Sequence, residues 1–199
     1  MLLLGLTGSI GMGKSTTAKL FVEAGVPVYD ADATVHQVYE GEAAPAMEAA
    51  FPGSTVNGKV DRQKLSAMVF NNHDAMTRLE KIVHPMLRSH QQKFLSEAEK
   101  SGAPVAVLDI PLLFETGGEK RVDAVVVVST TPDVQRARIL ERENMTHDKL
   151  DAILARQMPD AEKRKRADFI VDTGHGLEPV RERIREILAE VVKMPQRRI

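Results

Sequence analysis

Short apolar runs, each bounded by polar or turn-forming residues, recur along the chain and predict the buried strands of a sheet. The clearest run, at residues 122–129, reads VDAVVVVS and is apolar without alternation, which is typical of a central strand in a parallel sheet. The other runs lie at 2–6, 26–29, 104–109 and 169–172. Because stretches with helical periodicity separate them, the pattern predicts an α/β fold around a five-stranded parallel sheet.

Residues 33–102 interrupt this alternation with a longer, mostly helical segment. Its helical stretches lie near 33–39, 44–51, 61–70, 74–83 and 85–100. Asn57-Gly58 predicts a turn between two short strands, and His84-Pro85 predicts a break between two helices, because proline disfavours the helical conformation for the residue before it. The segment is too long for a simple strand crossover, so we expect a helical insertion beside the sheet.

The first predicted strand runs into a glycine-rich loop, Gly8-Ser9-Ile10-Gly11-Met12-Gly13-Lys14-Ser15, and a helix is predicted over 14–24. This is the GxxxxGK[S/T] motif in the strand-loop-helix setting of a P-loop. Its glycines let backbone N–H groups point at an anion, and the helix start adds the positive end of its dipole. The motif therefore predicts a nucleotide phosphate site, in which Lys14 carries the positive charge and the Ser15 hydroxyl coordinates Mg²⁺.

Acidic residues end two of the predicted strands. Asp30 and Asp32 follow the second strand and Asp109 closes the third, at the sheet edge where ligands bind in open α/β folds. We expect either Asp30 or Asp32 to cap the next helix and the other to be available for chemistry. Asp109 occupies the position of the Mg²⁺-side carboxylate in P-loop enzymes, although aspartate is also a common turn residue.

Three later segments have two interpretations each. The apolar loop 110–115 either forms a wall for a substrate or covers the core. Arg138 and Arg142 share a helix face, which is either a solvated basic face or part of a lid that we place at 138–164. The basic run Lys163 to Arg166 favours a solvated helix end over a nucleic-acid site.

Composition narrows the functional class. The 199 residues include 27 basic and 28 acidic side chains, a balance that does not suggest nucleic-acid binding, and they include no cysteine. No stretch reaches the roughly 18 apolar residues of a membrane span, so we expect a cytoplasmic protein. The chain lacks the NKxD element that reads guanine, and a helical insertion with an arginine-bearing hairpin favours a small-molecule kinase.

The chain resembles the dephospho-coenzyme A kinase family. The segments that carry the resemblance are LTGSIGMGKST (6–16), YDADATVHQV (29–38), VHPML (83–87), DIPLLFE (109–115), VVVVSTTPDVQRARILER (125–142) and RQMPDAEKRKRADFIVDTG (156–174). The resemblance implies a three-layer P-loop kinase fold over 1–199. Its core would be 1–32, 103–137 and 165–199, its acceptor-binding insertion 33–102 and its lid 138–164.

The resemblance also implies ATP-dependent phosphorylation of the ribose 3′-hydroxyl of dephospho-coenzyme A with Mg²⁺. We expect a monomer, with a weak oligomer as the alternative. Asp32 would be the general base, with Lys14, Arg138 and Thr7 at the transferred phosphoryl group. The ATP phosphates would contact Gly8, Gly11, Met12, Gly13, Lys14, Ser15 and Thr16, with Arg142 from the lid, and Mg²⁺ would bind Ser15 and Asp109. The acceptor would contact Asp32, His84, Pro85, Pro111, Leu112 and Leu113.

Two alternatives stay open, a kinase for another small hydroxyl acceptor such as a nucleoside monophosphate or sugar acid, and a non-catalytic nucleotide sensor. The chain also departs from the usual family sequence at three positions. Ser9 replaces a glycine and Met12 a serine in the P-loop, and Thr173 stands where the family often has asparagine.

Overall fold

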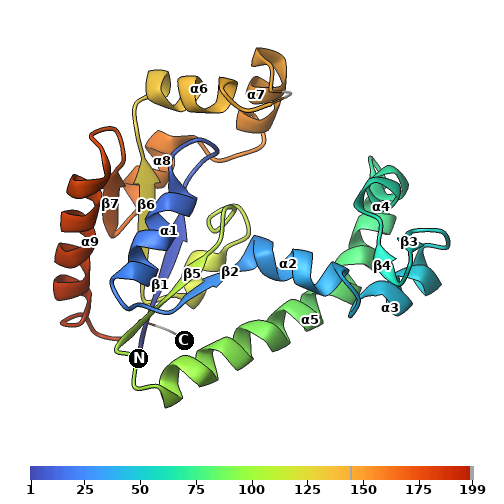
Figure 1. Ribbon diagram of the computed structural model, residues 1–199, viewed down its shortest axis with the longest axis horizontal. Helices are drawn as coiled ribbons and strands as arrows, with labels where there is room; N and C mark the ends of the chain where they lie inside the picture. Colours follow the sequence, from blue (N-terminus) through green and yellow to red (C-terminus); the bar gives the residue numbers. More distant parts are fainter. Residues whose placement is uncertain (144, 198–199) are drawn as a thin grey trace. The chain divides into compact units, whose positions relative to one another are not determined.

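The five predicted strands form one sheet in the structure, a computed structural model that describes residues 1–143 and 145–197 (Figure 1). Asn144 of the predicted lid and the last two residues of the predicted core lie outside this range. The strand order is β2-β5-β1-β6-β7, and the strands are β1 Leu2–Thr7, β2 Val28–Asp30, β5 Val105–Asp109, β6 Ala124–Ser129 and β7 Phe169–Asp172. The predicted α/β fold with a five-stranded parallel sheet is confirmed.

Strands β1 and β6 each have a neighbouring strand on both sides, and every residue in them is buried. β1 pairs in parallel with β5 on one side and with β6 on the other, so that Leu6 lies opposite Asp109 and Val126. This register brings the carboxyl ends of the three strands together, and the P-loop, Asp109 and the segment after Ser129 begin at that edge.

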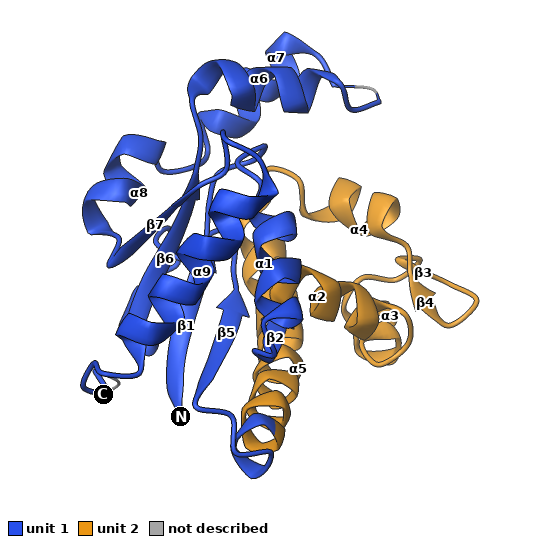
Figure 2. Ribbon diagram, turned by 60° about the vertical axis from the view of Figure 1, so that its left-hand side comes forward, with its two compact units in different colours: residues 1–29, 98–199 blue, residues 30–97 orange. Residues whose placement is uncertain are grey.

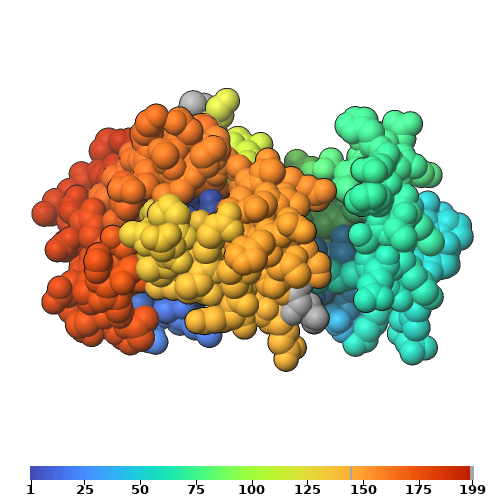
Figure 3. Space-filling view, turned by 90° about the horizontal axis from the view of Figure 1, so that it is seen from above, coloured from blue at the N-terminus to red at the C-terminus, as the bar shows by residue number. Residues whose placement is uncertain are grey.

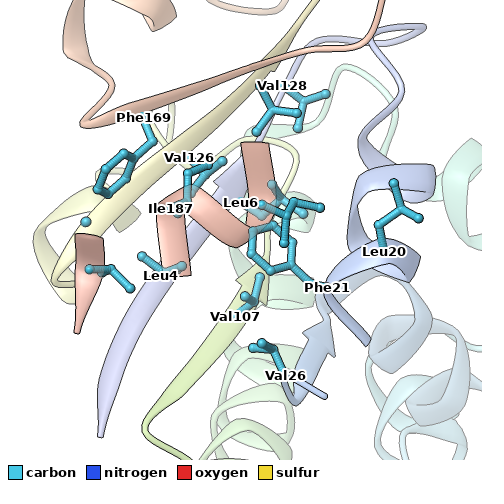
Figure 4. Close-up of a cluster of buried hydrophobic side chains, with 14 of the residues drawn as sticks. Leu4, Leu6, Leu20, Phe21, Val26, Val107, Val126, Val128, Phe169 and Ile187 are labelled. Carbon is cyan, nitrogen blue, oxygen red and sulfur yellow. The ribbon is translucent and has the colours of Figure 1, made fainter. Parts of the chain in front are cut away.

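Helices α1 (Lys14–Glu23) and α9 (Leu177–Val191) pack against the sheet and bury its main apolar cluster (Figure 4). α9 contributes Val180, Ile184, Ile187 and Val191, whose spacing of three or four residues places them on one helical face. α1 contributes Leu20 and Phe21. Because α1 directly follows the P-loop, its packing against the sheet fixes the end of the loop.

Three helices follow β6 before the chain returns to β7. They are α6 Pro132–Leu140, α7 His147–Leu154 and α8 Asp160–Arg166. The Thr131 hydroxyl caps α6 by accepting the Val134 N–H. α8 lies against β6. A short 3₁₀ helix, η1 (Gly118–Arg121), precedes β6.

The chain divides into two compact units (Figure 2). Unit 1 contains residues 1–29 and 98–199, and unit 2 contains residues 30–97. The elements that make up unit 2 are α2 Ala31–Tyr39, α3 Ala44–Ala50, β3 Thr55–Val56, β4 Lys59–Val60, α4 Arg62–Val69 and most of α5 His73–Lys100. β3 and β4 form the predicted hairpin around Asn57-Gly58, both of which have positive φ.

The predicted helix break at His84-Pro85 is wrong, because α5 runs through Pro85 without interruption. Val83 is buried in the apolar cluster of unit 2, and Leu79, Ile82 and Met86 pack against the same cluster. Burial of these side chains on both sides of Pro85 outweighs the one backbone hydrogen bond that proline removes. His84 therefore lies within the helix, where its side chain is exposed, and does not cap a helix end.

We predict that Pro85→Ala raises the free energy of unfolding by about 1–2 kcal/mol, because alanine restores the missing N–H inside α5. The gain is below the ~3 kcal/mol difference between proline and alanine in a helix, since proline also stiffens the unfolded chain. Urea denaturation measures it. Ser89→Ala, an exposed change on the same helix, is the control and should gain less than ~0.5 kcal/mol. Equal or lower stability of Pro85→Ala would contradict the prediction.

Candidate active site

The P-loop joins β1 to α1 through two residues in the left-handed region, Gly11 at φ 78° and Gly13 at φ 90°. Side chains are excluded there as well, because a Cβ on Gly11 would meet Ile139 at 2.6 Å and one on Gly13 would meet the Thr173 Oγ1 at 3.0 Å. Gly13 directly precedes α1, whose first turn presents the exposed Ser15 and Thr16. The loop and helix start therefore have the backbone conformation that the motif predicts.

Neither substitution in the P-loop disturbs its conformation. Ser9 is buried and is not among the described residues with positive φ, so a side chain is tolerated there. Met12 is 2% exposed and its Sδ accepts the Thr130 N–H at 3.2 Å. The Met12 side chain thus points into the core, and only its backbone is left to face a phosphate.

Two glutamines that sequence reasoning missed hold the outer part of the P-loop. The Ile10 N–H donates to Gln157 Oε1 at 3.1 Å, and the Ile10 carbonyl accepts from Gln135 Nε2 at 2.7 Å. Gln135 lies on α6 and Gln157 follows α7. The Gln135 and Gln157 side chains therefore satisfy the backbone N–H and carbonyl of Ile10, which form no regular secondary-structure hydrogen bonds.

Lys14 and Asp109 form an ion pair with Nζ and Oδ1 2.5 Å apart. Asp109 is 2% exposed at the end of β5, and Lys14 begins α1. The pair places a cation and a carboxylate side by side at the carboxyl edge of the sheet, where the sequence predicts both.

Arg138 reaches the P-loop through Thr173. Its Nη1 donates to the Thr173 Oγ1 at 2.9 Å, and its Nη2 donates to the Thr173 carbonyl at 2.7 Å. The adjoining cleft of about 300 Å³ is lined by Gly11, Gly13, Thr16, Thr17, Arg138, Arg142, Thr173, Gly176, Leu177 and Val180. The structure therefore brings three of the predicted P-loop residues, Gly11, Gly13 and Thr16, and both predicted arginines to one cleft.

Helices α6 to α8 cover much of the P-loop side of unit 1. Seen from above, their yellow and orange atoms leave only a few dark blue atoms of the N-terminal segment visible between them (Figure 3).

Part of the loop 110–115 covers the core, and another part is accessible as a wall for a substrate. Leu113 is fully buried, against Gly5 and Gly118, and Phe114 is also buried, so these two residues cover the core. Leu112 is 42% exposed, and the Pro111 carbonyl accepts the Thr7 hydroxyl at 2.9 Å. Pro111 and Leu112 are thus available near the P-loop, whereas the Leu113 side chain is inaccessible in this structure.

The remaining predicted site residues, Asp32, His84 and Pro85, belong to unit 2 and are all exposed. Asp30 makes the helix cap, accepting the Ala33 N–H at 2.9 Å, so Asp32 in the first turn of α2 is the acid left for chemistry. Unit 2 also contains a cavity of about 900 Å³. Its lining residues are Val35, Tyr39, Arg62, Gln63, Leu65, Ser66, Ala67, Val69, Phe70 and Leu79.

Comparisons with known proteins agree with this geometry. The family model described as dephospho-CoA kinase matches residues 2–178. A dephospho-CoA kinase of Rhodopseudomonas palustris (strain HaA2) is 78% identical over 198 residues, covering 100% of both chains. The chain belongs to the dephospho-CoA kinase family.

Two solved structures resemble this chain over nearly its whole length. The crystal structure of TT1252 from Thermus thermophilus is 35% identical with a TM-score of 0.84, over 95% of this chain and 97% of that one. The dephospho-CoA kinase from Campylobacter jejuni is 26% identical with a TM-score of 0.63, over 95% and 96%. Within the described residues of this family member, no helix is long and apolar enough to cross a membrane.

Lys163 is the member of the basic run that the sequence interpretation placed wrongly. It is 0% exposed, and its Nζ lies 3.0 Å from Glu115 Oε1 and 3.5 Å from the Pro111 carbonyl. Arg166 stays exposed, with its guanidinium 4.6 Å from the centre of the Phe114 ring. A run of basic letters carries no signal that one of them is buried, because the partner Glu115 is distant in sequence.

Glu115 joins this buried lysine to the segment that follows α7. Its Oε1 accepts the Met158 N–H at 2.8 Å as well as pairing with Lys163. Burial raises the pKa of the Glu115 carboxyl, but the hydrogen bonds from Met158 and Lys163 outweigh it and hold the pKa below its usual value. The pair thus ties α8 to the loop that carries Pro111, beside Thr7.

We predict that Lys163→Met lowers the free energy of unfolding by about 2 kcal/mol. This is less than the ~3–5 kcal/mol of a fully buried pair, because Glu115 keeps some solvent access and its Met158 bond. Urea denaturation measures it. Lys165→Met is the control, since Lys165 pairs with Glu162 at the surface and should change stability by under ~0.5 kcal/mol.

The difference in the free energy of unfolding between wild type and Lys163→Met should depend on pH. A carboxyl whose pKa is lowered on folding contributes stability above its unfolded pKa, about 4.5 for Glu115. The difference between wild type and Lys163→Met should therefore be full above that pH and shrink as the pH falls through the lowered pKa. A difference that is unchanged in acid, or equal losses in Lys163→Met and Lys165→Met, would contradict this account.

Proposed function

We propose that this family member transfers the γ-phosphoryl group of ATP to the ribose 3′-hydroxyl of dephospho-coenzyme A, giving coenzyme A and ADP. The observation that carries the proposal is the group of cations around the P-loop. Lys14 pairs with Asp109 at the start of α1, and Arg138 lines a cleft together with Gly11 and Gly13. Cations around a phosphate pocket are what phosphoryl transfer needs, because its catalysis is mainly positioning and charge stabilisation.

The donor would occupy the cleft with its phosphates on the P-loop. The backbone from Gly11 to Thr16 would cradle the phosphates, and Lys14 would contact the terminal ones. The cleft continues along Gly176 and Leu177, which offer a backbone and an apolar surface for the nucleoside. Arg142, exposed after α6, would cover the donor from the predicted lid.

The residues present fit a magnesium ion. Mg²⁺ prefers hard oxygen ligands and is usually held by one or two protein groups together with substrate phosphates. The Ser15 hydroxyl and the Asp109 carboxylate are such groups, and both belong to elements that meet at the P-loop edge of the sheet. When bound, the ion would neutralise phosphate charge.

The acceptor side rests on Asp32. An exposed carboxylate that is not used for helix capping can accept the proton of the ribose hydroxyl as the bond to phosphorus forms. His84, Pro85, Pro111 and Leu112 would line the acceptor, and the apolar cavity of unit 2 offers room for its longer arm. Thr7 and Arg138 would contact the transferred phosphoryl group.

The proposal includes a cytoplasmic location, which the absence of cysteine and of a predicted membrane span in the sequence supports. It also includes a monomer.

An acceptor panel tests the activity. The purified protein is incubated with ATP and Mg²⁺ and with dephospho-coenzyme A, nucleoside monophosphates or sugar acids, and ADP release is measured. We expect release with dephospho-coenzyme A and phosphate at its 3′-oxygen. Release with another acceptor alone would favour the broader kinase alternative, and binding of ATP without release with any acceptor would favour a nucleotide sensor.

We predict that Asp32→Asn lowers kcat by ~10²–10⁴-fold, the usual contribution of a general base, with little change in ATP affinity. Steady-state kinetics with both substrates measure this. Asp30→Asn is a matched control, because it removes a carboxylate two residues away while asparagine still caps α2. Undiminished turnover in Asp32→Asn, or the same loss in Asp30→Asn, would overturn the base assignment.

A further inference from the structure

Thr173 lies at the centre of contacts between the P-loop and Arg138. Its hydroxyl donates to the Met12 carbonyl at 2.7 Å and accepts from Arg138 Nη1 at 2.9 Å. Its own carbonyl accepts from Arg138 Nη2 at 2.7 Å. The side chain is 8% exposed, and its Oγ1 is 3.0 Å from where a Cβ on Gly13 would be. Thr173 thus contacts both the P-loop backbone and the Arg138 side chain.

These contacts require a side chain that can both donate and accept a hydrogen bond. The Met12 carbonyl can only accept and the Arg138 guanidinium can only donate, so the group between them must donate on one side and accept on the other. A threonine hydroxyl does both with a single atom. Valine has the same shape but leaves the Met12 carbonyl and one guanidinium N–H without this partner, whereas serine retains the hydroxyl.

The two bonds to Thr173 also restrict the orientation of the arginine. Arg138 has five N–H groups in a rigid plane, and Thr173 takes one from each of its terminal nitrogens. The guanidinium plane is therefore set by Thr173 relative to the P-loop, and the remaining N–H groups stay available for a phosphate. A freely rotating arginine would lose side-chain entropy on binding the phosphate.

We propose that Thr173 is a positioning residue that aligns Arg138 with the terminal phosphate of the donor nucleotide. The inference rests on the proposed function in that the donor is a nucleoside triphosphate bound at the P-loop. It does not depend on which acceptor is used. Thr173 acts through Arg138, and its contribution should disappear when Arg138 is removed.

Nucleotide binding without any acceptor gives the first test. Calorimetry measures the affinities of ADP and of a non-hydrolysable ATP analogue with Mg²⁺, and the ratio of the two reports contacts to the terminal phosphate. We expect Thr173→Val to reduce the preference for the triphosphate about tenfold, the effect of one charge-assisted hydrogen bond. Thr173→Ser should retain the wild-type preference.

The coupling to Arg138 gives the second test. In an Arg138→Ala background, Thr173→Val should cause no further loss of preference, because the residue through which it acts is absent. Where the wild type turns over dephospho-coenzyme A, kcat should fall about tenfold in Thr173→Val while the KM for the acceptor changes less than about twofold. A wild type without turnover would refute the proposed function alone, since the binding test stands by itself.

Thr130→Val is the matched control. Thr130 is also a buried threonine beside the sheet edge, but among the described residues its hydroxyl has no hydrogen-bond partner. Removing it should leave the triphosphate preference unchanged. Circular dichroism confirms folding, and Thr173→Ala replaces Thr173→Val if the valine variant does not fold.

Four results would overturn the proposal. They are an unchanged preference in the folded hydroxyl-free variant, a loss in Thr173→Ser as large as in Thr173→Val, an equal loss in Thr130→Val, and an additive loss in the Arg138→Ala background.

Discussion

Close packing of the P-loop is the constraint on which the rest of this structure depends. The loop is pressed by three separate elements, since positions 8, 11 and 13 have no room for a side chain against Val128, Ile139 and Thr173. At Gly8 the obstacle is the Val128 carbonyl, which lies 2.7 Å from a hypothetical Cβ and belongs to the backbone of β6. Strand β6, helix α6 and the turn after β7 therefore fix the loop in place.

This packing also explains why residues far apart in the chain work together. Ile139 and Arg138 are neighbours on α6, so the helix that confines Gly11 also presents the arginine to the cleft. Thr173 confines Gly13 and binds the same arginine. The residues that confine the backbone of the P-loop thus also set the position of Arg138 beside it.

The two ion pairs Lys14–Asp109 and Lys163–Glu115 differ in how far the lysine is buried. Lys14 pairs with Asp109 but keeps 16% of its side chain exposed, at the mouth of an anion site. Lys163 is completely enclosed and pairs with Glu115, where it links α8 to the loop of Pro111. The enclosed cation links α8 to the segment beside Thr7, and the partly exposed one lies at the start of α1, next to the P-loop.

The sequence by itself determined the strands, the P-loop and the acids at the strand ends, because hydrophobic periodicity, glycine freedom and capping chemistry act over a few residues. It also limited the helix cap to Asp30 or Asp32, and the geometry then assigned it to Asp30. Tertiary structure alone decided that Pro85 lies inside a helix, that Leu113 belongs to the core and that Lys163 is buried. Each depends on partners distant in sequence, whose burial or charge outweighs the local preference of the residue. Thr173 is the same case, since its role comes from contacts to Met12 and Arg138 that only folding brings together.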